Sequence, residues 1–473
     1  MKIGLVSLGC PKNLVDGEVM LGLAQDAGHE ITPNAADADV LVVNTCAFID
    51  RAKQESIDAI LEMAELKKAG PSRRLVVTGC LAERYRDELR DQIPEIDAVL
   101  GTGEVPRILE ALGPEARARA GEDGVPPPSA TVSPLTFYRP PRANAHKPLG
   151  SRTELPTYIY DADTPRVRAT PRHYAYVKIA EGCDYKCAFC IIPRLRGHYR
   201  SRPADSILTE ARRLVATGVR ELILISQDTT FYGRDRYQRG ALPRLLRDLN
   251  AVDGLEWIRL LYLYPTTIDE ATLEAFAACE KVVKYVDLPL QHASDRVLKR
   301  MRRPGTRASY EALLDRIRRT VPHVTLRTTF IVGFPGETAE DVDELSSFMD
   351  GVRFDHVGVF TYSHEEGTAA GALNDDVPLR VKRQRRDRLM RQQKSLVRTV
   401  QRSRVGQRVR LLVDGPSDEH ELVLRGRLSG QAPEIDPQVF LTECDPSRFD
   451  PGTFIEAEIV GARDYDLLAR PLL

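Results

Sequence analysis

Three closely spaced cysteines are the residues of this sequence best suited to do chemistry. Cys183, Cys187 and Cys190 stand in the string EGCDYKCAFCIIPRLRG at the spacing C-x3-C-x2-C. Thiolates ligate iron–sulfur clusters, and a four-iron cluster usually takes four of them, so three cysteines would leave one iron open. A zinc site or buried free cysteines are the alternatives. Structural zinc normally has four closed ligands, and no fourth Cys or His follows at finger spacing, although His198 could be proposed.

The same string resembles the signature of the radical S-adenosylmethionine (SAM) superfamily, including the aromatic Phe189 directly before the last cysteine. The resemblance implies that Cys183, Cys187 and Cys190 are catalytic cluster ligands. The open iron would chelate the amino and carboxylate groups of SAM and pass it an electron. Cleavage of a sulfonium bond would then give a deoxyadenosyl radical.

Three further cysteines each follow a predicted strand near the start of the chain. Cys10 ends KIGLVSLGC, Cys46 ends DVLVVNTC and Cys80 ends RLVVTGC. Each alone is more often a small buried core residue than a ligand. The alternation of strands with helices predicts a doubly wound parallel sheet, in which the carboxyl ends of the strands meet at one edge. Together the three cysteines therefore predict a second metal site, which would hold a second four-iron cluster.

The chain of 473 residues is too long for one ordinary core, and we expect an α/β protein of several domains. Residues 1–112 are predicted to form the doubly wound domain, with helices at 18–27 and 50–68. Residues 113–170 are rich in proline and read as a linker or insertion. Six strands alternating with helices predict a partial (β/α) barrel over 171–403, with its site at the strand carboxyl ends. Short strands over 404–473 predict a small β-barrel.

Composition and charge narrow the class of protein. No apolar run approaches the roughly 20 residues that span a bilayer, so no membrane contact is expected. Eight cysteines in 473 residues fit a reducing cytoplasm better than a disulfide framework. Residues 380–410 contain thirteen Lys and Arg and a single acid, Asp387. Residues 411–473 contain thirteen acids and five arginines. The acidic barrel should repel RNA and could attract a basic protein; the alternative is that its acids merely solvate the surface. For the basic helix at 379–402 two alternatives stay open: it contacts RNA, or it pairs with acidic residues elsewhere in the chain.

Nearly the whole chain is similar to the methylthiotransferase family, which combines a three-cysteine domain, a radical SAM barrel and a TRAM domain. One branch modifies a tRNA adenosine, and the other modifies an aspartate of small-subunit ribosomal protein twelve. The tRNA branch typically has Gln and Met where this sequence has Pro11 and Lys12. The strings that resemble the ribosomal-protein branch are SLGCPKNLVDGE (7–18), EGCDYKCAFCIIPRLRG (181–197), SQDTTFYG (226–233), YVDLPLQHASDRVLKRMRR (285–303), RTTFIVGFPGET (327–338), VGVFTYSHEEGT (357–368) and APEID (432–436).

The resemblance implies two [4Fe–4S] clusters and two uses of SAM, as methyl donor and as radical source. Sulfur held at the cluster on Cys10, Cys46 and Cys80 would couple to the β-carbon of the aspartate. The implied partners are ribosomal protein twelve or the small subunit, an external electron donor and a sulfur source. Methylthiolation of tRNA is the first competing hypothesis. A non-catalytic iron–sulfur factor for ribosome assembly is the second.

Two further strings carry candidate SAM contacts. Ser226, Gln227 and Asp228 follow a predicted strand and offer polar groups to the SAM amino group or ribose, although a polar strand end would look the same. Gly333 and Gly336 in VGFPGE resemble the cofactor-contacting segment of the superfamily, and glycine allows the backbone to approach a ligand closely. They would equally serve as turn residues.

Overall fold

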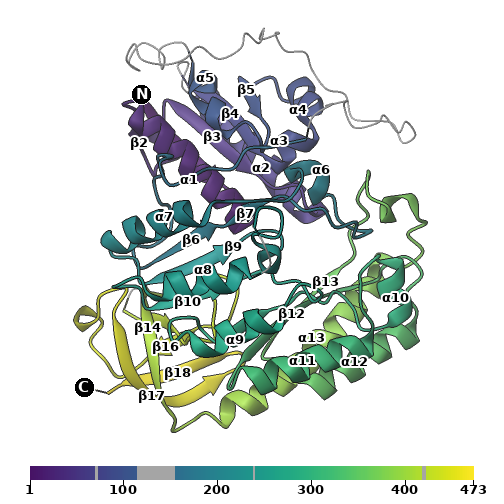
Figure 1. Ribbon diagram of the computed structural model, residues 1–473. Coiled ribbons are helices and arrows are strands. Elements are labelled where there is room, and N and C mark those ends of the chain that lie inside the picture. Colours follow the sequence, from purple (N-terminus) through teal and green to yellow (C-terminus); the bar gives the residue numbers. More distant parts are fainter. Residues whose placement is uncertain (70–72, 114–154, 238–239, 418–421, 473) are drawn as a thin grey trace.

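The N-terminal part of the chain is a five-stranded parallel sheet with helices on both faces (Figure 1). The computed structural model describes residues 1–69, 73–113, 155–237, 240–417 and 422–472. The strand order is β2-β1-β3-β4-β5. The strands are β1 (Lys2–Ser7), β2 (Glu30–Ile31), β3 (Val40–Thr45), β4 (Arg74–Gly79) and β5 (Ala98–Leu100), and the helices are α1 (Pro11–Asp26), α2 (Asp50–Lys68), α3 (Cys80–Arg84), α4 (Arg86–Gln92) and α5 (Ile108–Leu112).

Alternate residues of β3 explain why helices cover both faces of this sheet. Val40 and Val42 pack in one apolar cluster with residues of α1 and α5, whereas Leu41 and Val43 pack in another with residues of α2 and α3. A parallel strand buried on both faces reads as a continuous apolar run, as VLVV does here. The predicted doubly wound arrangement is confirmed.

The middle of the chain forms a partial barrel of six parallel strands. Two three-stranded sheets, β10-β9-β6 and β11-β12-β13, meet through a bridge between Ile258 and Val282. Its strands are β6 (Tyr174–Lys178), β9 (Glu221–Ile225), β10 (Trp257–Leu260), β11 (Tyr285–Asp287), β12 (Thr325–Val332) and β13 (His356–Thr361). Its helices are α6 (Ile192–Arg196), α7 (Ala204–Ala216), α8 (Ala241–Asn250), α9 (Glu270–Ala278), α10 (Asp295–Arg300), α11 (Arg307–Thr320), α12 (Ala339–Val352) and α13 (Leu379–Arg402). A small antiparallel pair, β7 (Ala180–Glu181) with β8 (Arg200–Ser201), frames the cysteine loop.

The C-terminal part is a closed five-stranded barrel with the order β14-β15-β16-β18-β17. The strands, yellow at the bottom of Figure 1, are β14 (Arg408–Pro416), β15 (Leu424–Arg427), β16 (Val439–Leu441), β17 (Phe454–Arg463) and β18 (Asp466–Pro471). The α/β fold class with a partial barrel and a small β-barrel is thus confirmed. No helix among the described residues is long and apolar enough to cross a membrane.

Several acids of this small barrel are bound within the molecule. The carboxylate of Glu434 accepts hydrogen bonds from the hydroxyls of Tyr174 and Tyr176, at 2.8 and 3.3 Å. Asp436 accepts one from Tyr285 at 2.6 Å and lies 3.4 Å from Arg327. Because Tyr174 and Tyr285 begin β6 and β11, the segment APEID closes the amino end of the larger barrel. The net charge of 411–473 therefore overstates the acidity that this barrel offers to a partner.

The segment predicted as a linker fastens the first two units together. Residues 114–154 lie outside the described part of the chain, and residues 155–170 contain neither helix nor strand. Arg166 donates to Glu18 of α1 at 2.5 Å and to Glu210 of α7 at 2.6 Å. Tyr160 is buried and also donates to Glu210. This segment runs along the seam between the sheet and the barrel. The domain limits at 112, 170 and 403 stay predictions.

Candidate active site between two cysteine triplets

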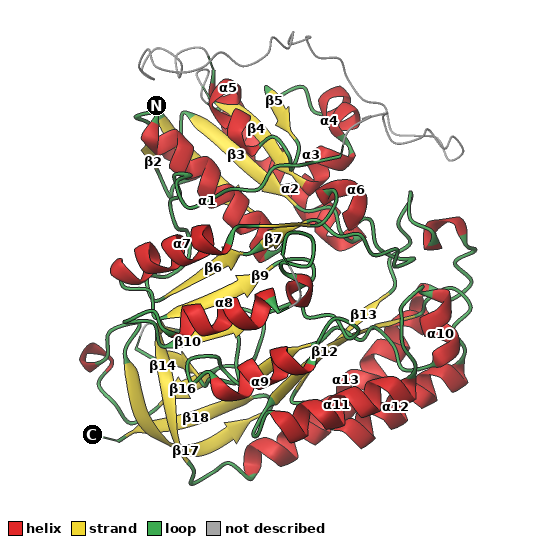
Figure 2. Ribbon diagram, in the orientation of Figure 1, coloured by secondary structure: helices red, strands yellow, loops and turns green. Residues whose placement is uncertain are grey.

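The triplet Cys183, Cys187 and Cys190 lies on the loop between β7 and β8, beyond the carboxyl end of β6. Figure 2 labels β6 and β7, from which this loop continues. The amide of Cys183 donates to Gly197, and that of Cys190 donates to Cys187, both at 3.1 Å. Gly182 has a φ of 88°, and a Cβ there would meet the carbonyl of His198 at 2.1 Å, so the tight start of the loop requires glycine. Burial raises the pKa of Cys183 to about 12, and the neighbouring Cys187 adds to the rise.

The second triplet gathers at the carboxyl edge of the N-terminal sheet. Cys10 precedes α1, Cys46 follows β3 and Cys80 begins α3 after β4. Gly9 has a φ of 89°, and a Cβ there would lie 2.9 Å from the Cys46 sulfur, so glycine allows these two loops to meet. Burial raises the pKa of Cys46 to about 12, with further contributions from Cys10 and Cys80. The structure therefore brings together three cysteines that are far apart in sequence, as expected.

The thiols of the two triplets are not arranged as ligands of a single metal ion. Across the described ranges, no three His, Cys, Asp or Glu side chains converge closely enough to hold one metal ion. In a four-iron cluster each thiolate binds a different iron, so its ligands stand further apart than those around one ion. All eight cysteines are free. Buried thiols whose pKa values are raised ionise poorly unless a cation compensates the charge, and binding a cluster would provide that compensation.

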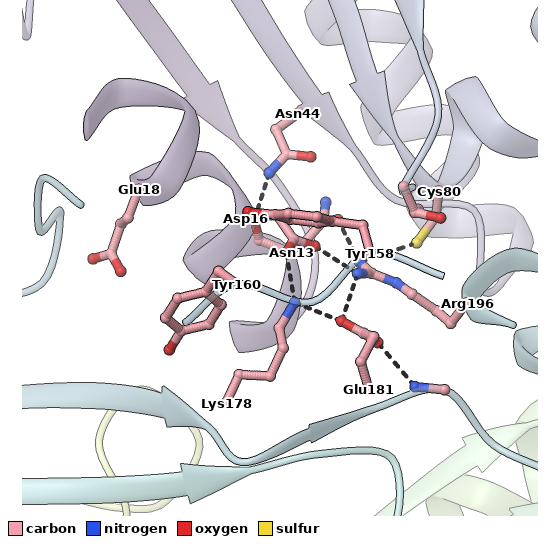
Figure 3. A network of polar contacts seen from close by, with 12 residues as sticks. Asn13, Asp16, Glu18, Asn44, Cys80, Tyr158, Tyr160, Lys178, Glu181 and Arg196 are labelled. Carbon is pink, nitrogen blue, oxygen red and sulfur yellow. Dashed lines mark hydrogen bonds and ion pairs between the residues drawn. The ribbon is translucent and has the colours of Figure 1, made fainter. Parts of the chain in front are cut away.

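A buried polar network links the Cys80 sulfur of the N-terminal triplet to strands β6 and β7 of the barrel across the seam (Figure 3). Lys178 at the end of β6 donates to Asp16 of α1 and to Glu181 of β7, both at 2.5 Å. Arg196 donates to Asp16 at 2.5 Å and points its other nitrogen at the Cys80 sulfur, 3.6 Å away. Two cations thus balance two carboxylates, which is the condition for burying them.

The electrostatics of this network favour the charged forms of Glu181 and Arg196. Burial alone would raise the pKa of Glu181, but Lys178 and Arg196 outweigh it and hold that pKa well below its usual range. For Arg196, burial opposes the charge, while Cys80, Glu181 and Asp16 raise its pKa further. A guanidinium fixed beside Cys80 would favour the thiolate form that a cluster needs.

Gln227 extends this network toward the predicted SAM site. Its amide nitrogen donates to Glu181 at 2.5 Å, while its carbonyl oxygen is buried without a hydrogen-bond donor. A buried acceptor without a hydrogen-bond donor is a candidate to bind a donor of a ligand, and the SAM ammonium group is such a donor. Ser226, by contrast, is fully buried and donates weakly to Thr229 at 3.4 Å. Among the three polar residues of this string, Gln227 offers the best placed free group.

Asp228 is occupied by its own loop. Its carboxylate caps the short 3₁₀ helix at 229–231 by accepting from the amides of Thr230 and Phe231, and it also accepts from the hydroxyl of Tyr185 at 2.8 Å. Burial raises its pKa, although these hydrogen bonds act in the opposite direction. The side chain therefore shapes the strand end, and a direct SAM contact by Asp228 stays a prediction.

The two candidate glycines adopt backbone conformations that L side chains avoid. Gly333 has a φ of 76°, and its amide donates to the carboxylate of Glu337 at 2.8 Å. Gly336 has a φ of 78°, and a Cβ there would lie 2.7 Å from the guanidinium of Arg300. These contacts account for both glycines as turn residues. Their contact with SAM stays a prediction.

Aromatic and cationic side chains that sequence reasoning did not single out surround Cys187. Arg303 is buried and donates to the Cys187 sulfur at 3.7 Å, and its guanidinium lies 4.0 Å from the ring centroid of Tyr264. Tyr264 in turn stacks on Tyr185 with 3.9 Å between ring centroids. Phe189 packs partly buried on the apolar cluster that holds Met301 and Phe334. Each triplet thus has one arginine directed at one of its sulfurs.

Comparisons with known proteins agree with this architecture. Residues 2–101 match the uncharacterized protein family UPF0004, residues 177–349 match the radical SAM superfamily and residues 405–472 match the TRAM domain. The "Ribosomal protein uS12 methylthiotransferase RimO" of Koribacter versatilis is 47% identical over 495 residues, covering 100% of this chain and 96% of the relative. The protein of the same name from Trichlorobacter lovleyi is 46% identical, covering 99% and 97%. The chain belongs to the RimO family.

One solved structure illustrates the shared architecture of RimO and more distant radical SAM enzymes. The radical SAM methyltransferase TsrM of Kitasatospora setae, with cobalamin and a [4Fe–4S] cluster bound, superposes with a TM-score of 0.52 at 17% identity. The match covers 78% of this chain and 74% of TsrM. At this identity the likeness establishes the fold alone.

The cofactors of a RimO chain are SAM and [4Fe–4S] clusters, as its radical SAM domain implies, and both triplets fit such clusters in donor type and number. Sequence reasoning singled out all six cysteines, whose role as cluster ligands stays a prediction, but it missed Arg196, Arg303 and Lys178. Each stands within or beside a string similar to the ribosomal-protein branch. No periodicity or spacing marks a single arginine as a neighbour of a cysteine 116 residues away.

Proposed function

We propose that this chain attaches a methylthio group to the β-carbon of an aspartate in ribosomal protein uS12. The observation that carries the proposal is the full-length match at 47% identity to a protein named as a uS12 methylthiotransferase. The two cysteine triplets support it, because sulfur insertion needs both a radical source and a sulfur carrier. A cluster on Cys183, Cys187 and Cys190 would supply the electron that cleaves SAM.

The remaining groups hold the reactants in place. Cys10, Cys46 and Cys80 would bind the second cluster, which would carry the sulfur to be inserted. The buried carbonyl of Gln227 would accept from the SAM ammonium group, and Arg303 and Arg196 would each stabilise one cluster thiolate. An external electron donor and a sulfur source complete the reaction, and we place it in the reducing cytoplasm.

The direct experiment is mass spectrometry of uS12 from cells with and without the gene for this chain. We expect uS12 to lose the mass of one methylthio group when the gene is absent. An unchanged uS12, together with a lost methylthio group on tRNA adenosine, would move the assignment to the tRNA branch. Binding of SAM without turnover in the purified enzyme would instead favour a role in ribosome assembly.

We also propose that α13 contacts RNA of the small subunit while uS12 is modified. Arg380, Arg391 and Arg402 recur every eleven residues, which places them on one face of the helix. All three are exposed and have no ion pair within the described residues. Other cations of the helix are already paired, as Lys394 and Arg398 are with Asp464. The free row is suited to phosphates.

A further inference from the structure

Lys12 is a buried cation that lacks an anionic partner. Its side chain is 7% exposed, and it makes no hydrogen bond or ion pair with any residue in the described ranges. Its ammonium nitrogen lies 2.9 Å from the ring centroid of Tyr262. A charged group removed from water is normally paired, because desolvation costs several kcal/mol otherwise. Among the described residues, however, Lys12 has no carboxylate partner.

No carboxylate beside Lys12 is free to pair with this charge. Lys12 is the second residue of α1, where the helix dipole places its positive end. Burial lowers the pKa of Lys12 to about 8, and the charge that most opposes this is the Cys10 thiol; the two carboxylates that also act on Lys12, Glu181 and Asp287, are bound elsewhere. Glu181 accepts from Lys178 at 2.5 Å, and Asp287 accepts from Arg327 at 2.8 Å.

The contact between Lys12 and Tyr262 is held by a constrained backbone. Tyr262 follows β10 with a φ of 62°, in the left-handed region that side chains other than glycine rarely adopt. Its amide donates to Asp287 and its carbonyl accepts from Thr229, at 2.9 and 3.0 Å. Such strain persists only where the surroundings enforce it, and it often marks a functional position. Here it fixes an aromatic wall beside the ammonium group.

We propose that the Lys12 ammonium group binds the side-chain carboxylate of the substrate aspartate. This inference rests on the proposed function and deepens it by naming the residue that recognises the substrate. Lys12 lies two residues after Cys10 of one triplet. Tyr262 lies two residues before Tyr264, whose hydroxyl is 4.0 Å from the Cys187 sulfur of the other. A carboxylate held by Lys12 places the adjacent β-carbon between the radical source and the sulfur carrier.

The test compares two peptides on the reconstituted full-length enzyme. One peptide carries the target aspartate of uS12 and the other carries asparagine at that position. We expect the native enzyme to bind the aspartate peptide at least about tenfold more tightly, because asparagine leaves the buried ammonium group without a charge partner. Lys12→Met should erase this preference by weakening the aspartate peptide alone, and Lys12→Arg should retain part of it. Lys67→Met, at a lysine that pairs with Asp97 in the same domain, is the matched control.

Each result has a defined meaning. Equal binding of both peptides by the native enzyme, or an unchanged preference in Lys12→Met, overturns the proposal. A variant that loses both peptides equally, with a shifted reduction potential of the N-terminal cluster, makes Lys12 a counter-ion of that cluster and also overturns it. A preference that depends on Lys12 but brings no methylthiolation of the peptide would leave the binding role standing and contradict the proposed function.

Discussion

Replacing Arg196 with methionine should open the seam between the N-terminal sheet and the barrel. The guanidinium is 3% exposed and donates to Asp16 at 2.5 Å and to Asn13 at 2.8 Å. Its loss leaves two buried carboxylates, Asp16 and Glu181, against the single cation Lys178. Removing one partner of a buried ion pair typically costs about 3–5 kcal/mol. Because Lys178 still bonds both carboxylates, we take the lower end, about 3 kcal/mol.

Hydrogen exchange measured by mass spectrometry would report this loss locally. Native-state exchange follows the free energy of opening of each region, so about 3 kcal/mol predicts roughly a hundredfold faster exchange in α1. Arg196→Lys should lie between the native chain and Arg196→Met, since it keeps the charge but not the fork of donors. Arg259→Met is the matched control, because Arg259 is fully buried and bonds Glu221 at the other end of the barrel.

Two outcomes would refute this reasoning. Exchange in α1 that changes by less than about threefold in Arg196→Met would mean that the network contributes little to the seam. Equal acceleration by Arg259→Met would mean that α1 responds to any loss of stability in the barrel. Either result would remove the structural basis for coupling the two triplets through Arg196.

Three further predictions follow from the same geometry. Replacing Cys183, Cys187 or Cys190 with Ala should abolish deoxyadenosine formation from SAM. Cys46→Ala should instead lower the bound iron from about eight to about four atoms per chain. About four iron atoms in both the native protein and this variant would count against the second cluster. The pKa of Glu181 is lower in the folded chain than its ordinary value of 4.5, so its contribution to stability is complete above pH 4.5 and is lost as the pH falls through the folded pKa. Acid should therefore speed hydrogen exchange at the seam. Glu181→Gln should reduce this response to acid. Replacing Arg380, Arg391 and Arg402 with Gln should lower the salt dependence of binding to small subunits by up to about three in logarithmic slope, and an unchanged slope would rule out phosphate contacts by this row.

Local pattern was sufficient to predict most elements of the fold. The helix predicted at 50–68 is α2 with the same limits, and apolar periodicity placed the barrel helices within a few residues of their positions. The helix predicted at 18–27 begins instead at Pro11. Its first turns hold polar residues such as Asn13 and Asp16, which a sequence reader assigns to a loop. They are buried because they face the barrel rather than solvent, and only tertiary contacts could reveal this.

The net charge counted from the sequence does not describe the charge that the surface exposes. The net charge of 411–473 suggested an acidic surface, yet Asp414, Glu434 and Asp436 bind cations or hydroxyls of the molecule itself. The basic helix is likewise partly used within the chain, since Arg385 pairs with Glu337 and Arg388 with Asp343. A sum of charges does not distinguish paired from free groups. The support for uS12 as substrate therefore comes from the full-length relatives rather than from the acidic tail.

The seam between the two triplets uses charged groups where apolar ones would serve stability better. Buried ion pairs often contribute no more to stability than well-packed apolar side chains of similar volume, so the network of Asp16, Lys178, Glu181 and Arg196 needs another explanation. Directional hydrogen bonds fix the register of two surfaces that apolar contacts would let slide. Here they run unbroken from the Cys80 sulfur through Arg196 and Glu181 to Gln227. Cys80 and Gln227 are thereby held at one distance, which the proposed coupling between a carbon radical and a cluster-held sulfur would require.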